Sequence, residues 1–395
     1  MVVVGGFIAF TVSASLMHAY TVYLLAFIEE FGWTRAESST AYSVGQVVAG
    51  VTAPMVGGMV DRLGSRRMVL LGGSLLTLGL LGSAVATTLW QVVLLYGVVM
   101  TFGANCIGMV VFAPLVSRLF VARRGMAISI LQSANGFGRA ISAPIAQLLV
   151  NEAGWRGAYL VQAGAMGLLV IPLAAMFRRA DSLPGAASPG VAGPSAAARD
   201  WTLGQAIRTR HFWLLFLVYM LTSIGSFLVS LHQVAFAVGM GFDPLYVAFV
   251  IGTGALLALP GVILTGSLSD VIGREWAAII AYGISIVGVA AAFGVTDANA
   301  HVMLWIHACC FGITWGARGP AITAKTADLF GGPRLGTILG VITIGSGLGA
   351  GLGSWGAGLL FDLTGSYDVA FMLSIAAYAL GAVAFWALRR PVARG

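Results

Sequence analysis

The sequence predicts an all-α membrane protein whose twelve transmembrane helices form two pseudo-symmetric six-helix bundles. Of 395 residues, 59% are hydrophobic and only 9% are charged, and the mean hydropathy is +0.94, far outside the range of soluble globular proteins. Twelve apolar runs are long enough to cross a bilayer, which takes about 20 residues each. Landmarks in the first half of the chain also recur in the second half.

The apolar runs are separated by charged or turn-rich breaks. We place the helices near residues 3–28, 38–59, 68–87, 90–116, 125–150, 156–177, 211–236, 244–268, 276–295, 301–323, 335–360 and 368–388. This predicts an N-terminal bundle at 1–177 and a C-terminal bundle at 211–395. Residues 178–210 are rich in Pro, Gly, Ala and Ser, which predicts a flexible cytoplasmic linker. Its last part, 201–208, mixes apolar and basic residues and predicts a short helix along the lipid headgroups.

The recurring landmarks indicate that the chain arose by duplication. Asp61 and Asp270 lie in related motifs, 209 positions apart (270 − 61). The glycines that match one another across the two halves at nearly this offset are Gly32, Gly125 and Gly154 with Gly241, Gly336 and Gly365. Two parallel copies of a six-helix unit are the signature of one large class of membrane transporters.

The basic residues follow the predicted topology. Of 21 Lys and Arg, 17 fall in segments that we place inside the cell. Arg35 and Arg156 fall outside, and Arg139 and Arg318 fall within the membrane. Because basic residues in short loops set orientation, both termini are expected in the cytoplasm, with the protein multi-pass in the inner cell membrane. The net charge of +7 therefore reflects topology, and we expect no nucleic-acid partner.

Two short charged turns have the composition of helix-hairpin tips. The first contains Gly57, Asp61, Arg62, Gly64, Arg66 and Arg67, and the second contains Gly266, Asp270, Gly273 and Arg274. Glycine permits close helix approach and the positive φ of a tight turn, and an Asp can cap a helix or pair with an Arg. We expect these ten residues to form a conformational latch that holds the inward-closed state.

The first turn resembles the loop signature of the major facilitator superfamily. Within that superfamily, several stretches resemble the bacterial monocarboxylate-transporter and oxalate/formate-exchanger branch, namely residues 30–35, 154–156, 232–233, 316–320 and 361–367. The resemblance covers the whole chain. It implies two rocking bundles around a central path lined by the first, fourth, seventh and tenth helices. Arg139 departs from the pattern, since many exchangers of the superfamily have a glycine there.

Two arginines carry the prediction of the substrate. No Asp or Glu falls inside any predicted span, whereas Arg139 and Arg318 do, and a charge within the membrane is costly enough to indicate function. Without a buried acid, the natural counter-ion is the cargo, and the planar Arg fork matches a carboxylate. The alternative for Arg318 is structural: beside Gly319 and Pro320 it could bond freed backbone carbonyls or reach toward the interface.

Other candidates for substrate binding are polar or aromatic side chains on the predicted cavity helices and, for Gln132, on the face of the fifth helix that also carries Arg139. They are His18, Tyr20, Tyr23, Asn105, Gln132, His232, Gln233, His307 and Thr314. The alternative reading is again structural, because a Ser or Thr in a membrane helix more often bonds its own backbone.

Coupling to protons stays open at this point. Relatives in the monocarboxylate branch are often proton-linked, and some use a Lys on the first helix and an Asp–Arg pair on the eighth. This chain has neither, so a proton would have to be carried by His18, His232, His307 or the substrate itself. Symport, exchange and facilitated diffusion all remain possible.

Enzyme and cofactor motifs are absent from the sequence. There is no phosphate-binding loop, which disfavours a nucleotide-driven pump, and Cys106, Cys309 and Cys310 predict neither a disulfide framework nor a metal site. We therefore expect no enzyme activity, cofactor or metal.

The predicted function is secondary active or facilitative transport of a small organic anion, a mono- or dicarboxylate, by alternating access in the lipid bilayer, with the protein acting as a monomer. One alternative is an exporter of apolar or cationic compounds, which the missing intramembrane acid disfavours. The other alternative is a non-transporting membrane sensor.

Overall fold

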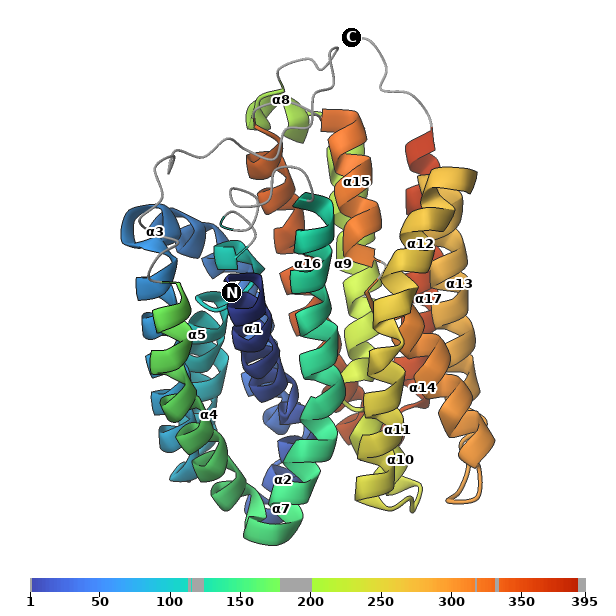
Figure 1. The fold of residues 1–395 in the computed structure, drawn as a ribbon. Helices are drawn as coiled ribbons and strands as arrows, with labels where there is room; N and C mark the ends of the chain where they lie inside the picture. Colours follow the sequence, from blue (N-terminus) through green and yellow to red (C-terminus); the bar gives the residue numbers. More distant parts are fainter. Residues whose placement is uncertain are drawn as a thin grey trace.

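The computed structural model describes residues 2–112, 115, 124–177, 201–316, 318–330 and 334–389, and throughout these residues the regular secondary structure is helical. The first half contains α1 (Val2–His18), α2 (Tyr20–Phe31), α3 (Arg35–Ala84), α4 (Leu89–Val92), the π-helix η1 (Val93–Met100), α5 (Thr101–Asn105) and α7 (Arg124–Met176). The second half contains α8 (Leu203–Ile207), α9 (Arg210–Ser230), α10 (Gln233–Gly239), α11 (Pro244–Leu256), α12 (Ala258–Ile272), α13 (Arg274–Ala292), α14 (His301–Trp315), α15 (Arg318–Phe330), α16 (Leu335–Thr364), α17 (Asp368–Trp386) and the 3₁₀-helix η2 (Ala387–Arg389). Figure 1 shows these helices standing side by side.

Twelve membrane crossings are recovered from this helix list. By length and composition, ten described helices could span a bilayer, and one of them, Ile130–Met176, is long enough to cover two predicted spans. The tenth predicted span corresponds to α14, which ends at Trp315, and α15, which begins at Arg318, and neither helix is long enough to count alone. The predicted all-α fold with twelve spans is confirmed, and the short helix expected within 201–208 is α8.

Glycines with positive φ record the duplication in the backbone. Among the described residues they are Gly32, Gly64, Gly154, Gly241, Gly273 and Gly365, with φ of 65°, 79°, 66°, 92°, 90° and 74°. They form three pairs separated by 209, 209 and 211 residues (241 − 32, 273 − 64, 365 − 154). Each pair places a positive-φ turn at the same point of each half. Glycine occupies these turns because it adopts a positive φ without steric cost.

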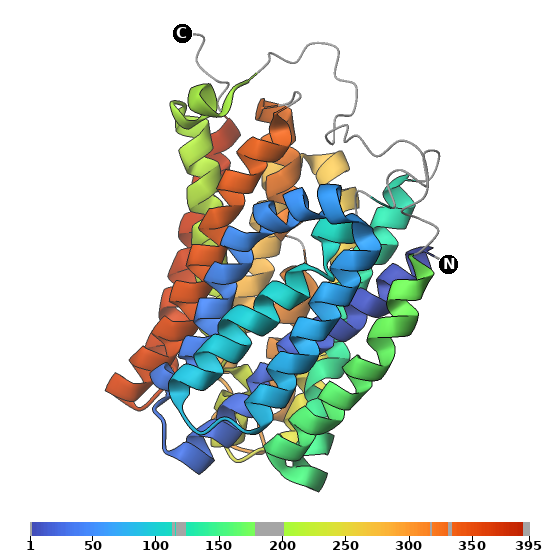
Figure 2. The ribbon, with the colours of Figure 1, turned by 90° about the vertical axis from the view of Figure 1, so that its left-hand side faces the viewer.

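Chain reversals gather at two ends of the bundle. We use "odd-loop end" for the end that holds the reversals near residues 32–34, 85–88, 154, 240–243, 293–300 and 365–367. It is the lower end in Figure 1, where α2, α10 and the reversal of α7 lie. The opposite end holds the turns at Gly64 and Gly273. Figure 2 shows α3 rising, turning at this upper end and running back.

Two hydrophobic clusters form the cores of the halves. The first consists mostly of buried residues between Ala9 and Phe177, and the second of residues between Ala206 and Leu388. The halves meet mainly where α3 packs along α16 and where α7 packs along α11. Residues 178–200, most of the predicted linker, lie outside the described part, so the division at 1–177, 178–210 and 211–395 stays a prediction.

Candidate functional site

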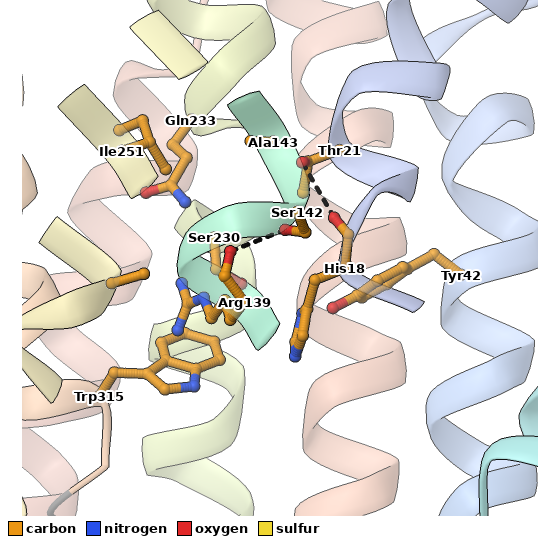
Figure 3. A pocket seen from close by; sticks show the side chains of 11 residues that line it. His18, Thr21, Tyr42, Arg139, Ser142, Ala143, Ser230, Gln233, Ile251 and Trp315 are labelled. Atoms are coloured by element: carbon orange, nitrogen blue, oxygen red, sulfur yellow. Dashed lines mark hydrogen bonds between the residues drawn. The ribbon is translucent and has the colours of Figure 1, made fainter. Parts of the chain in front are cut away.

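A cavity lies between the two halves, near the middle of the bundle. It is lined by His18, Thr21, Tyr42, Arg139, Ser142, Ala143, Ser230, Gln233, Ile251, Ala255 and Trp315 (Figure 3). It contains about 340 Å³ of space not filled by atoms, a volume that includes the part open to solvent. The first half of the chain supplies the lining residues up to Ala143, and the second half supplies those from Ser230 onward.

Breaks in the helices surround this cavity. His18 ends α1, Gln233 begins α10 after a break at residues 231–232, and Trp315 ends α14. Ala255 lies beside the break between α11 and α12. Broken helices are tolerated within a membrane only where they are buried or line a cavity, and they commonly form transporter binding sites.

Arg139 is the charged group of the cavity. It projects from α7, and only 8% of the residue is exposed. Its guanidinium carbon lies 3.6 Å from the centroid of the Trp315 ring, and Nη1 has no hydrogen-bond partner in the described part of the chain. None of the described residues that line the cavity is acidic. A buried cation with an unused donor and an aromatic face on one side can accept an anionic partner.

Arg318 lies behind the cavity and does not line it. Its Nη1 donates to the Thr222 carbonyl oxygen at 2.9 Å, while its Nε has no partner among the described residues. Its guanidinium carbon is 4.9 Å from the Trp315 ring centroid, so one indole contacts both buried arginines. Arg318 therefore bonds a backbone carbonyl oxygen, as the structural alternative from the sequence expects. This carbonyl belongs to α9, however, and not to the helix break beside Arg318.

Polar groups on the opposite side of the cavity come from several helices. His18 and Tyr42 point into the space beside Arg139, and Gln233 lies on the far side (Figure 3). Two lining hydroxyls bond the backbone of their own segment: Thr21 donates to the His18 carbonyl at 3.2 Å, and Ser142 to the Arg139 carbonyl at 2.7 Å. The Ser230 hydroxyl has no partner in the described structure.

The remaining predicted substrate-binding residues do not line this cavity. Most of them are paired within the protein, and their predicted role stays a prediction. Tyr20 donates to the Ser38 carbonyl at 2.6 Å, Asn105 donates to the Ala49 carbonyl at 3.0 Å and to Thr52 at 2.8 Å, and the His307 ring bonds the Gly288 carbonyl at 2.8 Å. Thr314 bonds Ser285 at 2.7 Å, Tyr23 stacks on Tyr159, Gln132 is exposed, and His232 bonds Ser354 and Tyr367.

Sequence reasoning missed several lining residues, above all Trp315 and Tyr42. Trp315 directly precedes the stretch 316–320 that was singled out for Arg318. Tyr42 lies on α3, outside the four helices expected to line the path. An aromatic residue adjoining a suspected helix break was the available signal for Trp315, whereas nothing local marks Tyr42.

The predicted latch residues occupy the end opposite the odd-loop end. Gly64 and Gly273 make the predicted turns. In the second copy Arg274 Nε bonds Asp328 at 2.6 Å, which joins α13 to α15 within one half. Arg62, Arg66 and Arg67 are exposed, and the side chains of Asp61 and Asp270 lie outside the described part. The latch role itself stays a prediction.

Comparison with protein families decides the identity of the fold. The model of the Major Facilitator Superfamily matches residues 2–342. The chain belongs to this superfamily. Its fold matches a crystal structure of a mutant of the nucleoside transporter NupG, with a TM-score of 0.78 at 14% identity over 99% of this chain and 100% of that one. It also matches a bacterial homologue of the human lysosomal transporter Spinster, with a TM-score of 0.71 at 15% identity over 98% and 94%.

Relatives in sequence lie among the monocarboxylate transporters. The chain is 28% identical to monocarboxylate transporter 13 of Rattus norvegicus, covering 95% of this chain and 85% of that protein. It is 28% identical to monocarboxylate transporter 11 of Homo sapiens, covering 88% and 73%. The resemblance drawn from the sequence motifs is confirmed, and this superfamily member is a multi-pass membrane transporter, not an enzyme.

Proposed function

We propose that the protein carries a small organic anion, a mono- or dicarboxylate, through the central cavity by alternating access of its two halves. The observation that carries this proposal is the unused Nη1 donor of Arg139 in a cavity whose described lining has no acidic residue. A carboxylate would complete the hydrogen bonding of this guanidinium and neutralise its charge at once. The sequence similarity to proteins named monocarboxylate transporters supports the same substrate class.

The cavity supplies a place for each part of such a substrate. The carboxylate would lie against Arg139, on the side of the guanidinium that the Trp315 ring does not cover. Ser230 and Gln233 would bond a hydroxyl or keto oxygen, and the short carbon skeleton would rest on Ile251 and Ala255. Arg318 would add positive potential from behind Trp315 without touching the substrate.

The coupling, topology and assembly belong to the same proposal. We take both termini to be cytoplasmic and the membrane to be the inner cell membrane, because the basic residues gather in the loops opposite the odd-loop end. His18 is the one histidine among the described residues that line the cavity, which makes it the candidate proton carrier if protons accompany the substrate. The cavity is formed within one chain, so a monomer would suffice.

The test is uptake by purified protein in liposomes. Arg139→Gln keeps a polar side chain but removes the charge, and we expect at least about a hundredfold loss of carboxylate uptake, because the variant loses the only charged group lining the described cavity. Arg318→Gln should lose less, about tenfold, since Arg318 acts only through the potential. Arg156→Gln at the odd-loop end is the control and should transport normally. Full uptake by Arg139→Gln would refute the anion proposal.

A further inference from the structure

At the odd-loop end, one carboxylate crosses from one half of the protein to the other. Asp362, near the end of α16, accepts hydrogen bonds from the backbone N–H groups of Arg35 at 2.9 Å and Ala36 at 2.8 Å. These are the first two residues of α3, whose amides have no partner within their own helix. A carboxylate there also complements the positive end of the helix dipole. Asp362 therefore caps a helix that belongs to the opposite half.

A chain of side-chain hydrogen bonds continues inward from this cap. Arg35 Nη1 donates to the Tyr367 hydroxyl at 2.6 Å, and that hydroxyl lies 3.2 Å from His232 Nδ1. His232 Nε2 lies 2.9 Å from the Ser354 carbonyl oxygen, and the Ser354 hydroxyl is 2.7 Å from that of Ser43 on α3. The Arg35 guanidinium carbon also lies 3.9 Å from the centroid of the Phe361 ring.

The directions of these bonds follow from their chemistry. A carbonyl oxygen only accepts, so Nε2 of the buried His232 carries the proton that it donates to Ser354. In a neutral ring Nδ1 then accepts, so the Tyr367 hydroxyl donates to it and uses its oxygen to accept from Arg35. Every donor in the series from Arg35 to Ser354 thus points the same way. The Arg35–Tyr367 bond and the Ser43–Ser354 bond cross between the two halves, whereas both bonds of His232 lie within the second half and hold Tyr367 and Ser354 in place.

Glycines allow the two helices to approach at this end. A Cβ on Gly358 of α16 would lie 2.6 Å from the Arg35 carbonyl oxygen, and one on Gly351 would lie 3.1 Å from that of Ser43. The contact with α3 continues as far as Gly347, whose Cβ would meet the Gln46 carbonyl oxygen at 3.0 Å. Beyond it, a Cβ on Gly340 would meet nothing within 4 Å. The tight packing of α16 on α3 is thus confined to the odd-loop side.

We propose that Arg35, Ser43, His232, Ser354, Asp362 and Tyr367 form a gate, here named the odd-loop clasp, that holds this end of the cavity closed. Asp362 is its principal residue, because among these six it is the one that caps α3 across the interface. Substrate passage toward the odd-loop end would require the bonds that cross between the halves to break, namely those of Asp362 to α3, of Arg35 to Tyr367 and of Ser43 to Ser354. The inference rests on alternating access, but not on the identity of the substrate.

The test uses the proximity of Ser43 and Ser354. In a background where Cys106, Cys309 and Cys310 are replaced by Ala, the pair Ser43→Cys and Ser354→Cys should form a disulfide under mild oxidation, because the two hydroxyls are 2.7 Å apart. The rate is followed by the loss of thiols that react with a polymer-tagged maleimide. No substrate is needed, so the result does not depend on whether a carboxylate is carried.

Three variants of this reporter separate the gate from a local effect. Asp362→Ala should slow cross-linking about fivefold, since charge-assisted hydrogen bonds at a partly exposed site are lost. Asp362→Asn, which keeps an oxygen acceptor, should fall between Asp362→Ala and the parent. Asp368→Ala is the matched control, because Asp368 bonds only its neighbour Ser366 among the described residues and should not alter the rate.

Two outcomes would overturn the proposal. Cross-linking of Asp362→Ala at the parent rate, in protein that elutes as a single sharp species, would show that Asp362 does not hold the halves together. Unchanged uptake by the fully cross-linked protein would show that this end need not open for transport. The expected result is that cross-linking stops uptake of a substrate and that reduction of the disulfide restores it.

Discussion

The central cavity and the odd-loop clasp use buried polar groups in opposite ways. Arg139 in the cavity keeps an unused donor, and Ser230 an unused hydroxyl, where helices are broken. In the clasp, both nitrogens of the His232 ring are paired, and α3 and α16 touch through glycines. An unpaired group gains free energy when a ligand arrives, whereas a paired group loses it when its contact opens. The first region is suited to binding and the second to holding one conformation.

The largest effect should come from filling the glycine contact of the clasp. Gly358→Ala places a Cβ 2.6 Å from the Arg35 carbonyl oxygen, so α16 and α3 must separate. Overpacking of about 1–3 kcal/mol should lower the cross-linking rate of the Ser43–Ser354 cysteine pair on the order of tenfold or more. Gly356→Ala, whose Cβ meets nothing within 4 Å, is the control. Equal cross-linking rates in the two variants would show that the close packing at Gly358 does not help to hold the clasp closed.

A smaller effect is expected from unpairing the histidine of the clasp. His232→Ala leaves the Tyr367 hydroxyl without its acceptor, which should cost about 1–2 kcal/mol and lower the thermal midpoint by about 2–6 °C. His232→Gln, which can still donate and accept, should recover part of the loss. Neither should change the KM for a transported carboxylate. A raised KM with an unchanged thermal midpoint would instead indicate that His232 binds the substrate, as the sequence predicts.

The contact between Trp315 and Arg139 can be tested in the cavity. Trp315→Ala removes the ring that lies 3.6 Å from the Arg139 guanidinium, and we expect KM to rise about five- to tenfold, because the cation–π contact that positions the guanidinium is lost. Trp315→Phe should stay within about threefold, because it keeps an aromatic face. Trp386→Ala, on an exposed part of α17, is the control. An unchanged KM in Trp315→Ala would mean that the indole does not position Arg139.

The smallest effect is expected at the opposite end of the bundle. Arg274 pairs with Asp328 within one half, and their side chains are 34% and 48% exposed. Arg274→Gln should therefore change the Ser43–Ser354 cross-linking rate by less than about twofold. A larger change would mean that the turn at Gly273 is coupled to the clasp, as a latch that stabilises the other conformation would require.

Periodicity and composition predicted the fold well because they report on single helices. The offset between the two halves predicted where the backbone repeats itself, and all three pairs of positive-φ glycines obey it. Of the residues that the sequence proposes for substrate binding, Arg139, His18 and Gln233 line the cavity, whereas Arg318 lies behind it. Helical spacing shows which residues share a face of one helix. It does not show which faces of different halves meet.

By itself, the sequence determined that this protein spans the membrane with twelve helices in two related halves, and that positive charge lies within the bilayer. These properties follow from local hydrophobicity and from turns that only glycine can adopt. Only the tertiary structure decided that one indole contacts Arg139 and Arg318, that Tyr42 reaches the same cavity, and that the clasp joins the two halves. Residues as far apart as Arg35 and Tyr367, 332 positions along the chain, meet in this way, because such contacts depend on how the two halves pack together.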